Sequence, residues 1–295
     1  LIIDSNRNIN PQTIQQGQLI QIPAYVAQNY QIKSGDSLWS IAMSRNLPLD
    51  TLFLINPNLN PNRLQIGQTI QVPLRITWRL VNGKQNYDYE VMMNDIQRLQ
   101  TVYPFLQVSS IGNSVLNRSI PEVLIGIGDK RVAYNGSFHA NEWITTPTIM
   151  TFLNDYALSL TNQTTIRGLI TSPLYEQTSL SIVPMVNPDG VNLVLNGPPE
   201  LEPYRSNVIQ WNNNSLDFSG WKANINGVDL NDQFPAQWEK ERDRNPKTPG
   251  PRDYGGESPL SQPESIAMAD LTRRRDFAHV LAFHTQGEVI YWGFE

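Results

Sequence analysis

Residues 131–143 read RVAYNGSFHANEW, and this stretch decides the fold of the larger part of the chain. The apolar run Val132–Tyr134 predicts a buried strand, since short apolar runs bounded by turn residues are typical of one. His139 and Glu142 follow, and residues three apart can point to the same side of a turn. In open α/β sheets, ligands bind just beyond the carboxyl ends of strands. The stretch therefore predicts a strand that leads into a candidate pair of metal-binding side chains.

The sequence around this stretch alternates strand-like and helix-like patterns. Further strands are predicted at Val123–Ile127, Ser179–Val186 and Val280–Phe283, and helices at Asp88–Tyr103, from Thr146 onward and at Ser261–Phe277. Thr146 is expected to cap its helix, and Asn187–Gly190 to form a turn. Arg273–Arg275 are expected to form a solvated last helical turn. Strands that alternate with helices indicate an α/β fold with helices on both faces of the sheet.

His284 follows a predicted strand just as His139 does. Together with Glu142 these two histidines would form the ligand set of a catalytic zinc site, which leaves one position open for water. A zinc ion so held polarises a carbonyl group and lowers the pKa of the bound water. The third histidine, His279, lies early in the last predicted strand, and it is expected to be a packed or edge residue.

The composition excludes several classes of function. The chain has 295 residues, no Cys, three His and a net charge of −5, with 40% hydrophobic and 17% charged residues. This balance, without a basic run, argues against nucleic-acid binding. No apolar stretch approaches the length of a membrane span, and the first residues lack a signal-peptide pattern. The absence of Cys excludes disulfides, thiolate metal sites and a cysteine nucleophile.

The first part of the chain contains an internal repeat. Residues 6–23 (NRNINPQTIQQGQLIQIP) and 56–73 (NPNLNPNRLQIGQTIQVP) are identical at 10 of 18 positions without a gap. The second copy is complete: a strand at Tyr30–Lys33, helices at Leu38–Ala42 and Leu49–Ile55, and a closing strand at Thr69–Val72. Asp36 or Ser37 is expected to cap the first of these helices. Leu38, Trp39, Ile41 and Ala42 are expected to form its apolar side.

This β-α-α-β unit resembles a LysM module through YQIKSGDSLWSIA, INPNL and LQIGQTIQVP. The resemblance implies binding to glycans that contain N-acetylglucosamine, as in peptidoglycan or chitin. The alternative is a small structural repeat without a ligand. The first copy holds only the second half of such a module, so the chain is expected to begin within a domain.

From about residue 87 to the end, five motifs occur in one order: FHANEW, VPMVNPDGV, WKANINGVDLNDQFP, YGGESPLSQPES and AFHTQGE. Together they resemble the zinc carboxypeptidase A family, which implies a mixed sheet with helices on both faces. By that resemblance the zinc ligands are His139, Glu142 and His284. Lys222 stands where the family has the Arg that polarises the scissile carbonyl. The implied substrate-binding positions are Asn141, Asn231, Asp232 and Gln286.

Asp232 departs from the family pattern most sharply. Carboxypeptidases carry at this position an Arg that clamps the C-terminal carboxylate of the substrate. The reversed charge should repel a plain carboxylate and attract an ammonium group. A substrate group that carries both an amine and a carboxylate would suit Asp232, and meso-diaminopimelate is such a group. The alternative is an ordinary loop carboxylate facing water. Lys222 also differs, since a lysine cannot form the two-pronged hydrogen bonds of an Arg.

The NDQF variant beside LysM modules resembles the bacterial γ-D-glutamyl-L-diamino acid endopeptidases. This implies a zinc metallopeptidase that cleaves peptidoglycan stem peptides at the γ-D-glutamyl–meso-diaminopimelate bond, held on the wall by LysM. The alternatives are a general zinc carboxypeptidase, or a non-catalytic peptidoglycan-binding protein. The expected location is extracellular or in the cell wall, with the spore as a further expectation.

The expected organisation is a partial LysM module at 1–23, a LysM module at 28–73, a linker at 74–86 and a zinc carboxypeptidase-like domain at 87–295. The family also needs a Glu as general base and a Tyr that covers the substrate. The resemblance places both beyond Glu295, so the sheet is expected to be incomplete at its C-terminal end and the fragment to turn over little.

Overall fold

The computed structural model describes residues 1–292. It divides into two compact units, Leu1–Trp78 with Thr101–Phe105, and Arg79–Gln100 with Leu106–Glu295. The boundary after Trp78 falls within the predicted linker.

The first unit contains the predicted β-α-α-β module. Its elements are β1 (Tyr25–Gln31), α2 (Leu38–Met43), α3 (Leu49–Ile55) and β2 (Thr69–Arg75). The two strands pair antiparallel, and the helices lie between them in sequence. Ser37 caps α2, since its side chain accepts a hydrogen bond from the Ser40 backbone N–H. A small core joins α2, α3 and β2, and Tyr25 and Tyr30 of β1 pack against it. Its buried residues are Ile32, Leu38, Ile41, Ala42, Leu47, Leu52, Ile70 and Val72.

The prediction that Trp39 lies on the apolar side of α2 is wrong. Its side chain is 63% exposed, whereas Leu38 and Ile41 are buried. The buried stripe of α2 consists of Leu38, Ile41 and Ala42, which stand at spacings of three and four residues, and Trp39 lies outside this stripe.

The two copies of the repeat share the same hydrogen bonds. Asn56 donates to a backbone carbonyl in α3 and to the Gln71 carbonyl, and it accepts from the Gln71 N–H, each at 2.8 Å. Asn6 makes the same three bonds, to α1 (Ile2–Ser5) and to Gln21, at 2.7–2.8 Å. The sequence repeat is therefore also a structural repeat over its second half.

The second unit is built on a five-stranded sheet with the order β3-β4-β8-β5-β9. The strands are β3 (Gln107–Asn113), β4 (Ser119–Ile125), β5 (Lys130–Asn135), β8 (Thr178–Val183) and β9 (His279–Ala282). β5 runs parallel to both β8 and β9, while β4 is antiparallel to β3 and β8. The sheet is therefore mixed, as predicted. His279 is exposed on β9, the edge strand, which agrees with the edge position expected for it.

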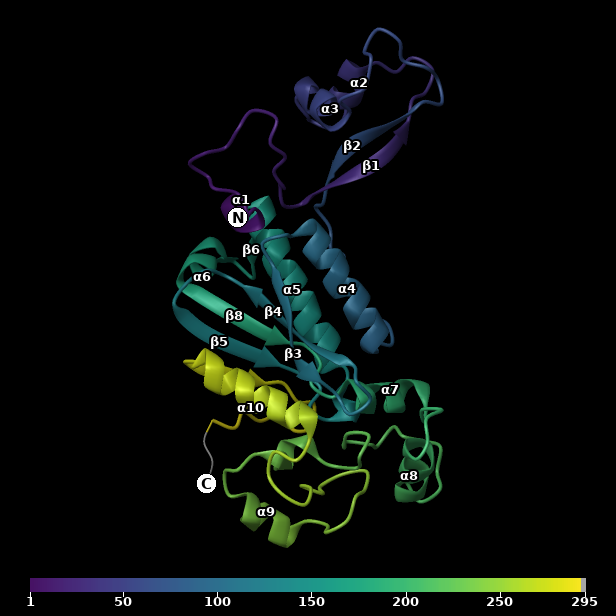
Figure 1. The fold of residues 1–295 in the computed structure, drawn as a ribbon, viewed down its shortest axis with the longest axis vertical. Helices are drawn as coiled ribbons and strands as arrows, with labels where there is room; N and C mark the ends of the chain where they lie inside the picture. Colours follow the sequence, from purple (N-terminus) through teal and green to yellow (C-terminus); the bar gives the residue numbers. More distant parts are fainter. Residues whose placement is uncertain (293–295) are drawn as a thin grey trace. The chain divides into compact units, whose positions relative to one another are not determined.

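Helices cover both faces of this sheet (Figure 1). On one face, Tyr134 of β5 contacts Phe152 of α5 (Thr145–Asn162), with ring centroids 5.8 Å apart. On the other face, Val183 of β8 packs with Met268 of α10 (Pro263–Arg275). Since successive strand residues point to opposite faces, and Tyr134 pairs with Ile182, the two helices lie on opposite sides.

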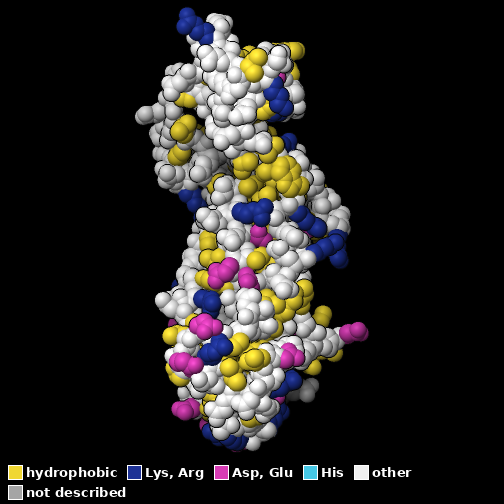
Figure 2. Space-filling view, turned by 90° about the vertical axis from the view of Figure 1, so that its right-hand side faces the viewer, with side chains coloured by type: hydrophobic (Ala, Val, Ile, Leu, Met, Phe, Trp, Pro, Cys, Tyr) yellow, Lys and Arg dark blue, Asp and Glu magenta, His cyan; other side chains and the backbone are white. Residues whose placement is uncertain are grey.

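The remaining elements of this unit are the helix α4 and several short segments. They are α4 (Tyr89–Val102), η1 (Ala140–Glu142), β6 (Thr165–Ile166), β7 (Leu169–Ile170), α6 (Ser172–Gln177), α7 (Pro188–Asn196), α8 (Tyr204–Trp211), η2 (Leu230–Gln233) and α9 (Trp238–Arg244). On the face seen in Figure 2, acidic and basic side chains are interspersed over this unit. None of the helices within residues 1–292 is long and apolar enough to cross a membrane.

Three local predictions are wrong. Thr146 does not cap α5, because the helix already begins at Thr145 and the Thr146 hydroxyl bonds the Pro184 carbonyl at 2.7 Å. Asn187–Gly190 is the capped start of α7, where Asn187 accepts from the Gly190 N–H at 3.0 Å. Arg275 is not simply solvated, since its guanidinium pairs with the buried Glu122 at 2.9 Å.

Candidate metal centre and substrate site

Two parallel strands bring the predicted metal ligands together. His139 lies just beyond β5 and directly precedes η1, the short helix that ends with Glu142. His284 lies just beyond β9. Because β5 and β9 pair in parallel, their carboxyl ends lie at the same edge of the sheet. Histidines 145 positions apart in sequence therefore meet at this edge.

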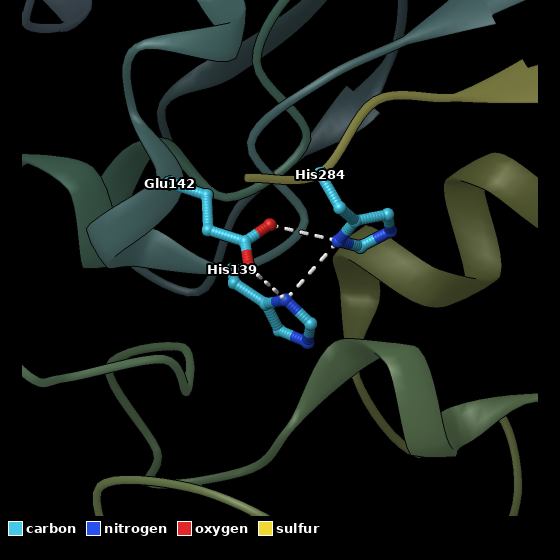
Figure 3. A group of neighbouring side chains, drawn as sticks. All are labelled: His139, Glu142 and His284. Atoms are coloured by element: carbon cyan, nitrogen blue, oxygen red, sulfur yellow. Dashed lines mark hydrogen bonds and ion pairs between the residues drawn. The ribbon is translucent and has the colours of Figure 1, made fainter. Parts of the chain in front are cut away.

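The three side chains point toward one another (Figure 3). His284 Nδ1 lies 3.2 Å from His139 Nδ1 and 2.8 Å from Glu142 Oε2, and His139 Nδ1 lies 3.2 Å from Glu142 Oε1. His139 and Glu142 are buried, while His284 is exposed. All three ligand atoms lie within 4.8 Å of one another, so the group could hold one metal ion.

The metal-free group carries strong internal electrostatics. Burial pulls the pKa of His139 down, but its hydrogen bonds to Asp229 and Glu142 outweigh burial and raise the pKa to about 9. Burial alone would raise the pKa of Glu142, yet its bonds to His139 and His284 lower it to about 2. A negative carboxylate therefore faces a positively charged imidazolium until a metal displaces the proton.

Asp229 is part of this site although the sequence did not reveal its role. Its Oδ1 lies 3.2 Å from His139 Nε2, the ring nitrogen that faces away from Glu142 and His284. Asp229 is 2% exposed, and it also accepts the backbone N–H groups of Asn231 and Asp253. In the sequence, Asp229 stands only two residues before the predicted substrate-binding residue Asn231. That position does not reveal which side chain the carboxylate contacts. A carboxylate in this position orients an imidazole toward a metal.

Lys222 lies beside the turn that carries His139 and Glu142. The Ala140 N–H donates to the Lys222 carbonyl at 2.9 Å, and the Asn141 N–H donates to the Trp221 carbonyl at 3.0 Å. Lys222 is 9% exposed, and no other residue in 1–292 forms a hydrogen bond or ion pair with its ammonium group. A lysine without an internal partner for its ammonium group therefore belongs to the segment whose backbone contacts the ligand turn.

The predicted substrate-binding residues differ in their surroundings. Asn141 has a buried Oδ1 that finds no hydrogen-bond partner among residues 1–292. Asn231 is exposed, and its backbone N–H is held by Asp229 at 3.1 Å. Gln286 is exposed two residues beyond His284. Asn141 and Gln286 are thus close to the metal ligands along the chain. Asn231 is linked to the site in the structure, through its hydrogen bond to Asp229.

Asp232 is a half-buried carboxylate on η2. Burial, reinforced by the negative charges of Asp229, Glu241 and Asp253, raises its pKa to about 7. Asn245 donates its side-chain N–H to Asp232 Oδ2 at 3.0 Å. Each of these acidic neighbours has its own cationic partner: His139, Arg244 and Arg252 respectively. Within residues 1–292, no cation pairs with Asp232 itself.

Two family models match the chain. Residues 92–295 match the zinc carboxypeptidase model, and residues 30–73 match the LysM domain model. The crystal structure of carboxypeptidase A from Helicoverpa armigera superposes with a TM-score of 0.51 at 23% identity, over 70% of this chain and 47% of that one. That likeness supports the fold alone.

Two bacterial relatives are more similar in sequence. The γ-D-glutamyl-L-diamino acid endopeptidase 1 of Lysinibacillus sphaericus is 72% identical over 295 residues, which is the whole of this chain and 74% of that protein. The uncharacterized protein YqgT of Bacillus subtilis (strain 168) is 44% identical over 225 residues, or 75% of this chain and 60% of that protein. The chain therefore belongs to the zinc carboxypeptidase family of peptidases and carries a LysM domain.

Proposed function

We propose that the chain is part of a zinc metallopeptidase that cleaves peptidoglycan stem peptides at the γ-D-glutamyl–meso-diaminopimelate bond. The observation that carries this proposal is the convergence of His139, Glu142 and His284 at one edge of the sheet, in a chain 72% identical to a γ-D-glutamyl-L-diamino acid endopeptidase. A general zinc carboxypeptidase is the less favoured alternative, because Asp232 would repel a substrate's terminal carboxylate.

The donor set fits zinc. Two imidazole nitrogens and one carboxylate are the protein ligands of a common type of catalytic zinc site. With ligand bonds of about 2.0–2.1 Å and tetrahedral angles, neighbouring ligand atoms lie about 3.3 Å apart. The three contacts of 2.8–3.2 Å between His139, Glu142 and His284 are close to this spacing. When bound, zinc supplies a Lewis acid that polarises the scissile carbonyl and activates water.

The chain's own residues would prepare this chemistry. Asp229 holds His139 Nε2 and so keeps Nδ1 directed at the metal position. We assign to Lys222 the stabilisation of the negative oxygen that develops as water attacks the carbonyl, because its backbone contacts the ligand turn and no residue among 1–292 pairs with its ammonium group. Asn141 remains a proposed substrate contact, because its buried Oδ1 has no hydrogen-bond partner among residues 1–292.

Asp232 would select the diamino acid. A half-buried carboxylate without a cationic partner favours a positively charged ligand group, and the side-chain ammonium of meso-diaminopimelate is such a group. Asn245 holds one carboxylate oxygen, which leaves the other free to pair with the ammonium. Asn231 and Gln286 remain the proposed contacts to other polar groups of the substrate.

The LysM domain would hold the enzyme on its substrate. LysM modules bind glycans containing N-acetylglucosamine, and attachment to the glycan strand raises the effective concentration of the peptidase near the stem peptides. This arrangement implies an extracellular or wall-associated protein.

Incubation of the zinc-loaded chain with a purified muropeptide tests the proposal. Mass spectrometry should detect release of a diaminopimelate-containing fragment, and a chelator should stop the release until zinc is restored. Release of a single C-terminal amino acid would instead indicate a general carboxypeptidase. Binding to peptidoglycan without zinc-dependent cleavage would favour the non-catalytic wall-binding protein.

A further inference from the structure

Three buried hydroxyl side chains lie beneath the turn that carries His139 and Glu142. They belong to Ser137, Thr145 and Thr146, which are 0%, 5% and 0% exposed. Ser137 precedes the turn, and the two threonines follow it at the start of α5. Buried polar groups are stable only when hydrogen-bonded, so the partners of these hydroxyls show what they hold in place.

The backbone at Ser137 needs external support. Its φ is 50°, in the left-handed region that residues other than glycine seldom adopt. Such a conformation persists only where surrounding contacts impose it. Ser137 lies two residues before His139, so the backbone conformation at Ser137 affects the position of the His139 side chain.

The hydrogen-bond directions follow by elimination. The Thr145 hydroxyl donates to the Glu142 carbonyl at 2.9 Å, so it must accept the bond from the Ser137 N–H at 2.8 Å. The Thr146 hydroxyl donates to the Pro184 carbonyl at 2.7 Å, so the Ser137 hydroxyl donates either to Thr146 Oγ1 at 2.7 Å or to Thr145 Oγ1 at 3.2 Å. Each threonine hydroxyl has one proton, and neither has a second to give.

The Thr145 hydroxyl therefore joins the two ends of the ligand turn. One of its bonds reaches the backbone of Ser137, before His139, and the other reaches the backbone of Glu142. Gly136 makes room for this arrangement, because a Cβ at that position would lie 2.9 Å from Thr145 Oγ1. We infer that Thr145 is a positioning residue for the metal site, whose hydroxyl fixes the separation of His139 and Glu142 before a metal binds.

This inference rests on the proposed ligands but not on the proposed substrate. The turn from Ser137 to Glu142 has to present an imidazole nitrogen and a carboxylate oxygen 3.2 Å apart. Without the Thr145 hydroxyl, the Ser137 N–H and the Glu142 carbonyl both lose a buried partner, and the turn can open. Outer partners of metal ligands typically change metal affinity or activity by roughly 10- to 100-fold.

The test compares Thr145→Val with Thr145→Ser in the whole chain. The valine has nearly the same shape without a hydroxyl, and the serine keeps the hydroxyl. Zinc dissociation constants are measured by competition with a chromophoric chelator, and the visible absorption of the cobalt(II) form reports the ligand geometry. Thr145→Val should weaken zinc binding roughly 10- to 100-fold and alter the cobalt spectrum. Thr145→Ser should stay near the unsubstituted chain in both.

Two controls separate positioning from general destabilisation. Ser137→Gly keeps the left-handed backbone and the N–H that Thr145 accepts, but removes the Ser137 hydroxyl, so its zinc affinity should change only a few-fold. Thr148→Val removes an exposed hydroxyl that bonds the Ile144 carbonyl in the same helix, and it should leave zinc affinity unchanged. Equal losses in Thr145→Val and Ser137→Gly would overturn the inference.

Near-UV circular dichroism of the metal-free variants checks that they fold. If Thr145→Val does not fold, Thr145→Ala takes its place. If neither folds while Thr145→Ser does, the hydroxyl is a requirement of folding and the inference is overturned. An unsubstituted chain that binds no zinc would instead refute the proposed ligands, so the two failures are distinguishable.

Discussion

Asp229 Oδ1 lies 3.2 Å from His139 Nε2, so a buried carboxylate holds the side of the imidazole that faces away from Glu142 and His284. The contact joins a residue of the turn after β5 to a residue 90 positions later that caps η2. A carboxylate at this nitrogen fixes both the tautomer and the orientation of the ring. The other nitrogen, Nδ1, is left facing the candidate metal position.

Asp229→Asn should therefore weaken zinc binding roughly 10- to 100-fold, since asparagine removes the negative charge that orients His139. Equilibrium competition with a chelator measures the zinc dissociation constant. Asp253→Asn is the matched control, because Asp253 pairs with Arg252 and meets Asp229 only through its backbone N–H. Equal zinc affinity in both variants would rule out an orienting role for Asp229.

Zinc binding should release a proton from His139 near neutral pH. The pKa of His139 is raised to about 9 in the metal-free chain, so at about pH 7.5 the imidazolium must lose a proton before Nδ1 can bind a metal. Calorimetric titrations in buffers of different ionisation enthalpy measure this release. His279→Ala should leave it unchanged, because His279 is exposed and does not belong to the metal group. A binding enthalpy independent of the buffer would contradict the prediction.

The same pKa predicts how the metal-free chain responds to pH. The folded-state pKa of His139 lies above its ordinary value of 6.5, so its stabilising contribution is complete below about pH 6.5. That contribution should be lost as the pH rises toward 9. Thermal unfolding of the metal-free chain across this window should show a falling Tm, and His139→Gln should flatten the dependence. A Tm that stays constant in the unsubstituted chain would show that His139 does not titrate this way.

Asp232 should control the KM for substrates that carry an amine. Its pKa is raised to about 7 in the metal-free chain, and only the ionised carboxylate can pair with an ammonium group. KM for a diaminopimelate-containing stem should therefore rise as the pH falls below about 7, while kcat changes less. Asp232→Asn should raise KM roughly 10- to 100-fold, the loss expected for a hydrogen bond between charged groups, and remove this pH dependence.

Asp243→Asn is the charge-matched control for Asp232, because Asp243 is exposed on α9 and pairs with Arg242. Asp232→Arg should shift selectivity toward substrates with a free C-terminal carboxylate. If substrate selectivity is the same with Asp, Asn and Arg at position 232, the prediction is contradicted and Asp232 is an ordinary loop carboxylate without a role in selecting the substrate.

Lys222 should act on kcat more than on KM. Its charge is expected to stabilise an oxygen that becomes negative only during the reaction, and loss of one such donor typically lowers kcat 10²- to 10³-fold. Lys222→Met should show this loss in steady-state kinetics, whereas Lys222→Arg should retain most of the activity. Lys240→Met on α9 controls for the loss of one positive charge. A kcat for Lys222→Met within a few-fold of the unsubstituted value would exclude the proposed role.

The sequence by itself determined the features whose cause is local. The spacing of His139 and Glu142 after an apolar strand predicts that both side chains reach one place, and the structure brings them within 3.2 Å. The repeat predicts that residues 6–23 form the second half of the module, and Asn6 and Asn56 make the same hydrogen bonds in the two copies. Strand and helix patterns predict a sheet covered on both faces. Spacing and repetition are sufficient here, because both can be read from the sequence without knowledge of the tertiary contacts.

Only the tertiary structure decided the features that join distant segments. The parallel pairing of β5 with β9 brings His284 to His139, and the path of the chain after residue 191 brings Asp229 beneath the same imidazole. Thr146 does not cap α5, because its hydroxyl bonds the Pro184 carbonyl, 38 positions along the chain. The two hydrogen bonds by which the Thr145 hydroxyl joins Ser137 to Glu142 depend on the left-handed backbone at Ser137. Such contacts follow from strand register and packing, which no short stretch of sequence contains.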